Sequence, residues 1–269
     1  MARQSSSGTS FITFALLFLV ALPAAAADSV IRNGIDPWIT GDEGRTFFDF
    51  STDPIPSGFF CGGSPAFTGR VTFKGEPIAT SPPDALGGAD TIVQRLDDAR
   101  FDERGVAYTR VQVRALSFSS IEPVKTACGP FQVSVSLDGP QQPVTRMKIV
   151  RDHDQGGRYL AAISLGVRIA FTPLAGKSSE RLELTRSATF PVLSGAFWST
   201  RPGNPGLTRE GFFLADTDGD GKPDTFLPGT SNFAPGWRSG GDSAVEPDAS
   251  PTQHCIDAGE GCHCMNCAY

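Results

Sequence analysis

Strict alternation of apolar and polar residues is the feature that most limits how this chain can fold. Residues 131–137 read Phe-Gln-Val-Ser-Val-Ser-Leu, so every second side chain is apolar. Residues 106–118 alternate in the same way, and Val111, Val113 and Ala115 are predicted to face one common side. Because successive side chains of a strand point to opposite faces, this period of two predicts β-strands with one buried face.

Four further segments have a similar pattern of apolar and polar residues and are predicted as strands, at residues 70–74, 144–150, 159–171 and 181–190. Glycine and proline are frequent, with 30 and 21 copies among 269 residues, whereas their usual combined share is roughly 12%. Such frequent breakers disfavour long helices and suit short strands joined by turns. The chain is therefore predicted to be all-β.

Local signals add detail to this prediction. Asp138-Gly139 is typical of a hairpin turn, so the segments 131–137 and 144–150 are predicted to pair with each other. Residues 89–101 are ambiguous, because Asp90 could cap a helix that begins there. We favour a strand, since the surrounding sequence is β-like. Residues 212–214, Phe-Phe-Leu, are predicted as one more short strand.

Residues 50–62 and 118–129 show a faint internal similarity. Each segment begins with Phe and two hydroxyl residues, continues through proline to Cys-Gly, and precedes an alternating strand. Cys61 and Cys128 hold equivalent positions and could pair as a disulfide. The similarity predicts Ig-like β-sandwich units, either two related units in tandem or halves of one sandwich.

These observations predict an order of segments along the chain. The predicted segments are a signal peptide at 1–27, a first β unit at 28–125, a second β unit at 126–200, a calcium-loop segment at 201–231, and a low-complexity, cysteine-rich tail at 232–269.

The first residues have the pattern of a secretory signal. Arg3 precedes an apolar block at 11–22, and the small residues at 24–27 offer a cleavage site before Asp28. The block is too short to span a bilayer, which needs roughly 20 apolar residues, and no later apolar run is long enough. The chain is predicted to be secreted or periplasmic. Its net charge of −6 disfavours nucleic acid as a partner, which leaves an unknown extracellular ligand or surface.

An acidic run at 216–224, Asp-Thr-Asp-Gly-Asp-Gly-Lys-Pro-Asp, is predicted to bind Ca²⁺. Calcium prefers hard oxygen ligands, and a twelve-residue loop can supply them from alternate positions. Gly221 stands at the sixth position, where a sharp turn needs glycine, but Leu227 stands at the twelfth, where an EF-hand has glutamate. The predicted ligands are Asp216, Asp218, Asp220, the backbone carbonyl of Lys222, and Asp224.

Two resemblances support these predictions. The acidic run resembles the calcium turns of thrombospondin type-3 and FG-GAP repeats in extracellular proteins. The segments Asp-Pro-Trp at 36–38, Pro-Ile-Pro-Ser-Gly-Phe-Phe at 54–60 and Asp-Thr-Ile-Val at 90–93 resemble a group of uncharacterised secreted bacterial proteins. This second resemblance covers the middle of the chain. It implies secretion and a β fold, and it assigns no catalytic residue.

The C-terminal tail gathers thiol and imidazole groups. Such a set could bind Zn²⁺ or copper, but disulfides are favoured because the predicted compartment is oxidising. The residues concerned are His254, Cys255, Cys262, His263, Cys264 and Cys267.

No stretch of the chain has a nucleophile or metalloprotease motif, so the leading prediction is a non-enzymatic β-sandwich protein with one structural calcium loop. One alternative is an extracellular hydrolase in which His153 or Asp154, within Asp152-His153-Asp154, does acid–base work. The other alternative is a protein that handles metal through its cysteine-rich tail.

Overall fold

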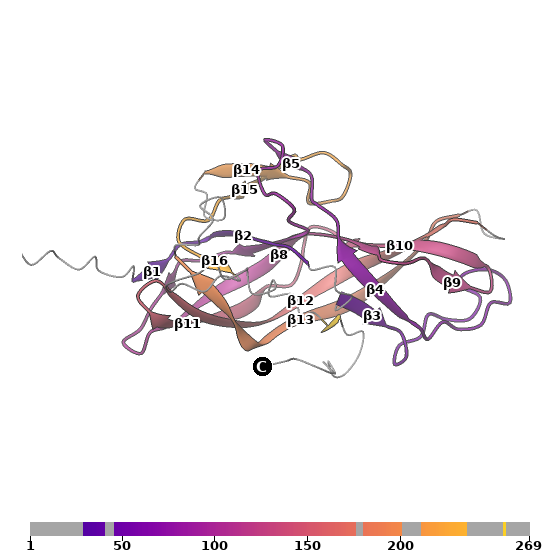
Figure 1. The fold of residues 1–269 in the computed structure, drawn as a ribbon, viewed down its shortest axis with the longest axis horizontal. Helices are drawn as coiled ribbons and strands as arrows, with labels where there is room; N and C mark the ends of the chain where they lie inside the picture. Colours follow the sequence, from indigo (N-terminus) through magenta and orange to yellow (C-terminus); the bar gives the residue numbers. More distant parts are fainter. Residues whose placement is uncertain (1–28, 41–45, 176–179, 201–210, 236–254, 257–269) are drawn as a thin grey trace, which may run out of the picture.

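All regular structure in the described part of the chain is β-strand, which confirms the all-β prediction. The computed structural model describes residues 29–40, 46–175, 180–200, 211–235 and 255–256 (Figure 1). The predicted signal peptide at 1–27 lies outside them. The strands are β1 (Val30–Ile31), β2 (Gly34–Trp38), β3 (Thr46–Asp49), β4 (Arg70–Gly75), β5 (Thr80–Ser81), β6 (Thr91–Arg95), β7 (Ala99–Arg100), β8 (Val106–Ser120), β9 (Val124–Thr126), β10 (Gly129–Leu137), β11 (Thr145–His153), β12 (Gly156–Pro173), β13 (Leu182–Ser199), β14 (Phe212–Ala215), β15 (Thr225–Pro228), β16 (Ala234–Pro235) and β17 (Cys255–Ile256).

Three long strands, β8, β12 and β13, form the frame of a twelve-stranded sheet. Shorter strands lie end to end along them. Both β10 and β11 pair with β8 on one side and β12 on the other, while β4 and β6 pair with the opposite side of β8. The sheet folds over into a β-sandwich (Figure 1). The segments 28–125 and 126–200 therefore contribute neighbouring strands to the same sheet.

The hairpin predicted at Asp138-Gly139 is wrong. Strands β10 and β11 do not pair with each other, because they occupy successive stretches of the same position between β8 and β12. Residues 138–144 leave the sheet between them, and the side chain of Gln142 bonds to the backbone there. Its Oε1 accepts from the Gly166 N–H at 2.8 Å, and its Nε2 donates to the Gly139 carbonyl at 2.8 Å.

A bulge in strand β8 changes which face of the sheet the following side chains point to. Val93 of β6 lies opposite Val113, but the preceding Ile92 lies opposite Ala115, so β8 has one extra residue. Ala115 consequently packs with Ile92 in a small outer cluster, whereas Leu116 packs in the main core. The prediction that Ala115 faces the same side as the earlier valines is therefore wrong, because period-two reasoning assumes an unbroken register.

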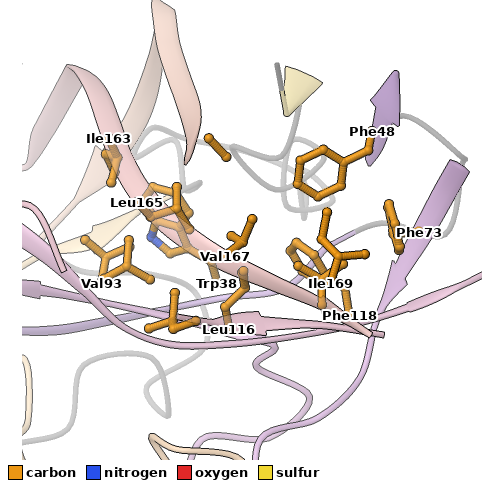
Figure 2. Close-up of a cluster of buried hydrophobic side chains, with 14 of the residues drawn as sticks. Trp38, Phe48, Phe73, Val93, Leu116, Phe118, Ile163, Leu165, Val167 and Ile169 are labelled. Carbon is orange, nitrogen blue, oxygen red and sulfur yellow. The ribbon is translucent and has the colours of Figure 1, made fainter. Parts of the chain in front are cut away.

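The space between the layers of the sandwich is filled by aromatic and branched side chains. Figure 2 shows part of this core, with Ile163, Leu165, Val167 and Ile169 of β12 pointing from one side. Every one of these four residues is at most 1% exposed. Burying each such side chain stabilises the fold by about 1.5–3 kcal/mol. The strand predicted at 159–171 is therefore confirmed, and its alternation matches the inward face of β12.

An aromatic group closes the end of the core near β9. The Phe60 ring lies 5.1 Å from that of Phe131 and 5.2 Å from that of Phe171, centroid to centroid. Next to it, Cys61 and Cys128 form a disulfide, as their equivalent positions in the two similar segments indicated. The bridge ties the loop before β4 to the chain between β9 and β10. Extended loops around residue 60 are thereby held against the sandwich.

A three-stranded sheet, in the order β15-β14-β5, covers part of the sandwich from outside (Figure 1). We call this sheet and its connections, residues 77–89 and 211–228, the outer layer. Its contact with the sandwich is a small apolar cluster in which Phe213, Ala215 and Leu227 meet Ile35 and Ile92. The segment predicted at 201–231 therefore packs on the β units through its described part.

The chain enters the main core again after the outer layer. Phe233 and Ala234 are fully buried, and β16 pairs with the end of β13. The start predicted for the low-complexity tail, residue 232, thus falls inside the packed sandwich. The high Gly, Ser and Pro content of this segment predicted a polar tail, although the segment contains a buried aromatic residue near its start, Phe233.

Candidate functional site

The acidic run forms the connection of a β-hairpin. Strand β14 ends at Ala215 and β15 begins at Thr225, and the two strands pair directly. Carboxylate oxygens of Asp216, Asp218 and Asp220 all lie within 4.8 Å of one another. Such a group of hard oxygen atoms is the kind of ligand set that Ca²⁺ prefers.

Backbone hydrogen bonds fold the loop around Asp216. Its Oδ1 accepts from the Gly219 N–H at 2.7 Å, and its Oδ2 accepts from the Gly221 N–H at 2.8 Å. Both glycines have positive φ angles, 79° and 85°, which side chains with a Cβ rarely adopt. Asp220 repeats the pattern, since its Oδ1 accepts from the Lys222 N–H at 2.7 Å. The glycine spacing read from the sequence thus matches the turns that bring the carboxylates together.

Two of the positions in the predicted twelve-residue loop lie apart from the three clustered carboxylates. Leu227, at the twelfth position, is buried in the contact between the outer layer and the sandwich, so it anchors the hairpin instead of facing the loop. Asp224 is not in the group of three carboxylates; one of its oxygens lies 3.4 Å from the Thr225 hydroxyl. The exposed Lys222 ammonium lies 3.4 Å from Asp220.

The other predicted metal ligands fall largely outside the described residues. Among the tail residues, only Cys255 is described, in β17, where it lies opposite Phe47 of β3 in a parallel pair. His254, Cys262, His263, Cys264 and Cys267 lie beyond the described part, so their predicted metal or disulfide role stays a prediction.

The Asp152-His153-Asp154 cluster stands at the turn between β11 and β12. Asp152 accepts two hydrogen bonds from the guanidinium of Arg158, at 2.8 and 3.1 Å. These bonds hold the pKa of Asp152 below its ordinary value. A carboxylate of that kind is poorly suited to donate a proton. His153 and Asp154 are exposed at the turn.

A buried ion pair, which the sequence reasoning missed, lies inside the sandwich between β2 and β6. Asp36 and Arg95 have fully buried side chains, and the Arg95 Nε lies 3.1 and 3.0 Å from the two carboxylate oxygens. Burial raises the pKa of Asp36 to about 6, although the Arg95 charge acts in the opposite direction. A signal was available, because Arg95 stands two residues after Val93 and therefore shares its inward face.

Arg95 also contacts the segment at residues 230–233. Its Nη2 donates to the Thr230 hydroxyl at 2.6 Å, its Nη1 donates to the Arg32 carbonyl, and its guanidinium lies 4.7 Å from the centre of the Phe233 ring. Tyr159 packs edge-on against Phe233, and burial is the main cause that raises its pKa well above the ordinary value. This cluster is best explained as a structural joint that ties residues 230–233 to β2 and β6.

In the described residues no helix is long and apolar enough to cross a bilayer. No protein-family model, no curated protein sequence and no solved structure matches the chain.

Proposed function

We propose that this is a secreted, non-enzymatic β-sandwich protein whose β14–β15 hairpin holds one structural Ca²⁺. Its role would be binding or structural support outside the cell. The observation that carries the proposal is the convergence of the Asp216, Asp218 and Asp220 carboxylates in a loop whose glycines permit the turns.

The ion would serve to order the hairpin. The loop places three carboxylates side by side, and their mutual repulsion opposes the turn unless a cation offsets it. The backbone carbonyl of Lys222 and the carboxylate of Asp224 are the further ligands proposed from the sequence. The Leu227 side chain supplies no oxygen ligand at the position where an EF-hand has glutamate. We therefore expect weak binding, with a dissociation constant on the order of 10⁻⁴ to 10⁻³ M as in other extracellular calcium modules.

Two features support a location outside the cytosol. Residues 1–27 have the composition of a secretory signal. The Cys61–Cys128 disulfide suits an oxidising compartment, because thiols in the cytosol are kept reduced.

The test is a titration with CaCl₂ followed by amide NMR signals of the folded protein. We expect the Gly219 and Gly221 signals to shift with a midpoint on the order of 10⁻⁴ to 10⁻³ M. MgCl₂ should act more weakly, because Mg²⁺ demands near-octahedral geometry and gives up its water reluctantly. The variant Asp216→Ala/Asp218→Ala should lose the response.

A matched control removes two carboxylates elsewhere. Glu122→Ala/Asp154→Ala changes the net charge equally at exposed positions and should keep the wild-type response. If calcium shifts no loop signal at 10-fold above the expected midpoint, the proposed ion site is wrong.

A further inference from the structure

An apolar surface lies on the outside of the outer layer. Phe212 and Phe226 are 74% and 73% exposed, the two most exposed large apolar side chains among the described residues. Pairing places Phe212 opposite Pro228 and Leu214 opposite Phe226. Since alternate residues share a face, these four side chains form one surface, which we call the hairpin face. Contiguous exposed apolar surfaces of this kind often mark sites of association.

The surroundings of the hairpin face are acidic. The only charged residues in the outer layer are five aspartates and one lysine. Four of the aspartates stand in the loop at 216–224, beside Phe226 and Leu214, and the fifth is Asp84. A partner for this surface should therefore combine apolar side chains with positive charge.

The same chain offers such a surface on another side of the sandwich. On the outward side of β11, Lys148 lies between Tyr108 of β8 and Leu160 of β12, directly opposite both. The next outward residue, Arg146, stacks its guanidinium on the Tyr108 ring at 3.8 Å. We call these four residues, Tyr108, Arg146, Lys148 and Leu160, the basic face.

The charge of the basic face is not neutralised within the described chain. The structure shows no ion pair of Arg146 or Lys148 with any described residue, whereas neighbouring Arg110 and Arg158 are paired with Asp97 and Asp152. The residue directly opposite Arg146 on β8 is Arg110, so this neighbouring strand offers Arg146 no carboxylate.

We propose that the hairpin face of one molecule docks on the basic face of a second copy of this chain. Aromatic and aliphatic side chains would meet in the centre, and the loop aspartates would lie against Arg146 and Lys148. Figure 1 places the outer layer above β2 and places β11 below it, so one molecule can use both surfaces at once. The contact is head-to-tail, so each molecule can bind one copy on each side, which predicts chains or rings larger than a dimer.

Each named surface is defined by only four side chains, whereas a stable interface of standard size uses roughly 20–30 residues per partner. The association should therefore be weak and should depend on salt, because its charges lie at the surface. It should be visible in sedimentation velocity at high protein concentration and low ionic strength. A chelator in the buffer keeps the loop free of cations, so the result does not depend on the proposed calcium site.

Two variants each remove one surface. Phe212→Ser/Phe226→Ser disables the hairpin face, and Arg146→Glu/Lys148→Glu disables the basic face. All four positions are exposed, so the fold should be preserved, which circular dichroism can check. We expect the wild type to form a concentration-dependent series of species and each variant alone to stay monomeric. A mixture of the two variants should give dimers and nothing larger, because only one intact contact is possible.

Val144→Ser/Leu174→Ser is the matched control, since these side chains are also exposed, at 48% and 55%, and belong to neither face. This control should associate like the wild type. A wild-type protein that stays monomeric at about 1 mM would overturn the proposal. So would a mixture of the two surface variants that forms no dimer, or a single variant that associates normally.

Discussion

The interior of the sandwich and the outer layer are built from the same type of strand, yet they are held in different ways. In the interior, long strands bury an almost continuous set of aromatic and branched side chains. The outer layer meets the sandwich through a few residues, chiefly Phe213, Ala215 and Leu227. Its outward side carries the exposed Phe212 and Phe226, and its hairpin loop carries four aspartates.

This difference indicates how stability is divided. Local regions with few buried contacts can open without unfolding the whole protein. We therefore expect the outer layer to open more easily than β10 or β12, and to be the part of the molecule whose order a ligand can change. The position of the acidic loop, at the tip of that layer, fits such a role.

The largest expected difference comes from removing one phenyl ring in each region. Phe131→Ala opens a cavity among the packed rings of the core and should lower the free energy of unfolding by about 3–5 kcal/mol. Phe213→Ala should lower it by less, because its cost cannot exceed the free energy needed to detach the outer layer. Urea denaturation measures both values. Equal losses would contradict the division of stability between the two regions.

The buried ion pair gives the next effect. Arg95→Met leaves the Asp36 carboxylate buried without its partner and should cost about 3–5 kcal/mol. The double variant Asp36→Leu/Arg95→Met removes both charges and should recover part of that loss, since apolar replacements of buried pairs are often neutral, while the Arg95 bonds to Thr230 and Arg32 stay absent. Urea denaturation again provides the measurement. A double variant as unstable as Arg95→Met would show that the charges themselves are required.

The same pair predicts a smaller effect of pH. The folded-state pKa of Asp36 is raised to about 6, above the roughly 3.9 of an unfolded aspartate. Between about pH 4 and pH 6 the folded protein therefore binds more protons than the unfolded protein does. The stability that Asp36 contributes is lost as the pH rises through this range. The stability of wild type minus that of the double variant should fall by about 1–3 kcal/mol over this range. A difference that stays constant with pH would contradict the raised pKa.

Much of the sandwich could be predicted from the sequence because burial on one face imposes a period of two. The segments 131–137 and 159–171 show this clearly and became β10 and the centre of β12. Pairing could not be predicted in the same way. The Asp138-Gly139 signal is local, whereas strands β10 and β11 are both held by distant neighbours, β8 and β12.

Other features were hidden because they depend on a register that the sequence does not display. The bulge that turns Ala115 outward is set by the pairing of β6 with β8. Asp36 and Arg95 are adjacent only through the pairing of β2 with β6, so their meeting in the core required the fold. By contrast, the acidic loop is contiguous in sequence, and its glycines indicate its turns without any distant contact.

Hydrogen exchange with and without calcium tests the central claim most directly. The amides of residues 211–228 are compared in 10 mM CaCl₂ (about tenfold above the weak end of the expected range) and in chelator, with residues 129–173 of β10, β11 and β12 as an internal reference. We predict that calcium slows exchange at Gly219, Gly221 and Lys222 and in β14 and β15, while the reference strands do not change. Identical exchange in the outer layer under both conditions would contradict a structural calcium ion in this hairpin.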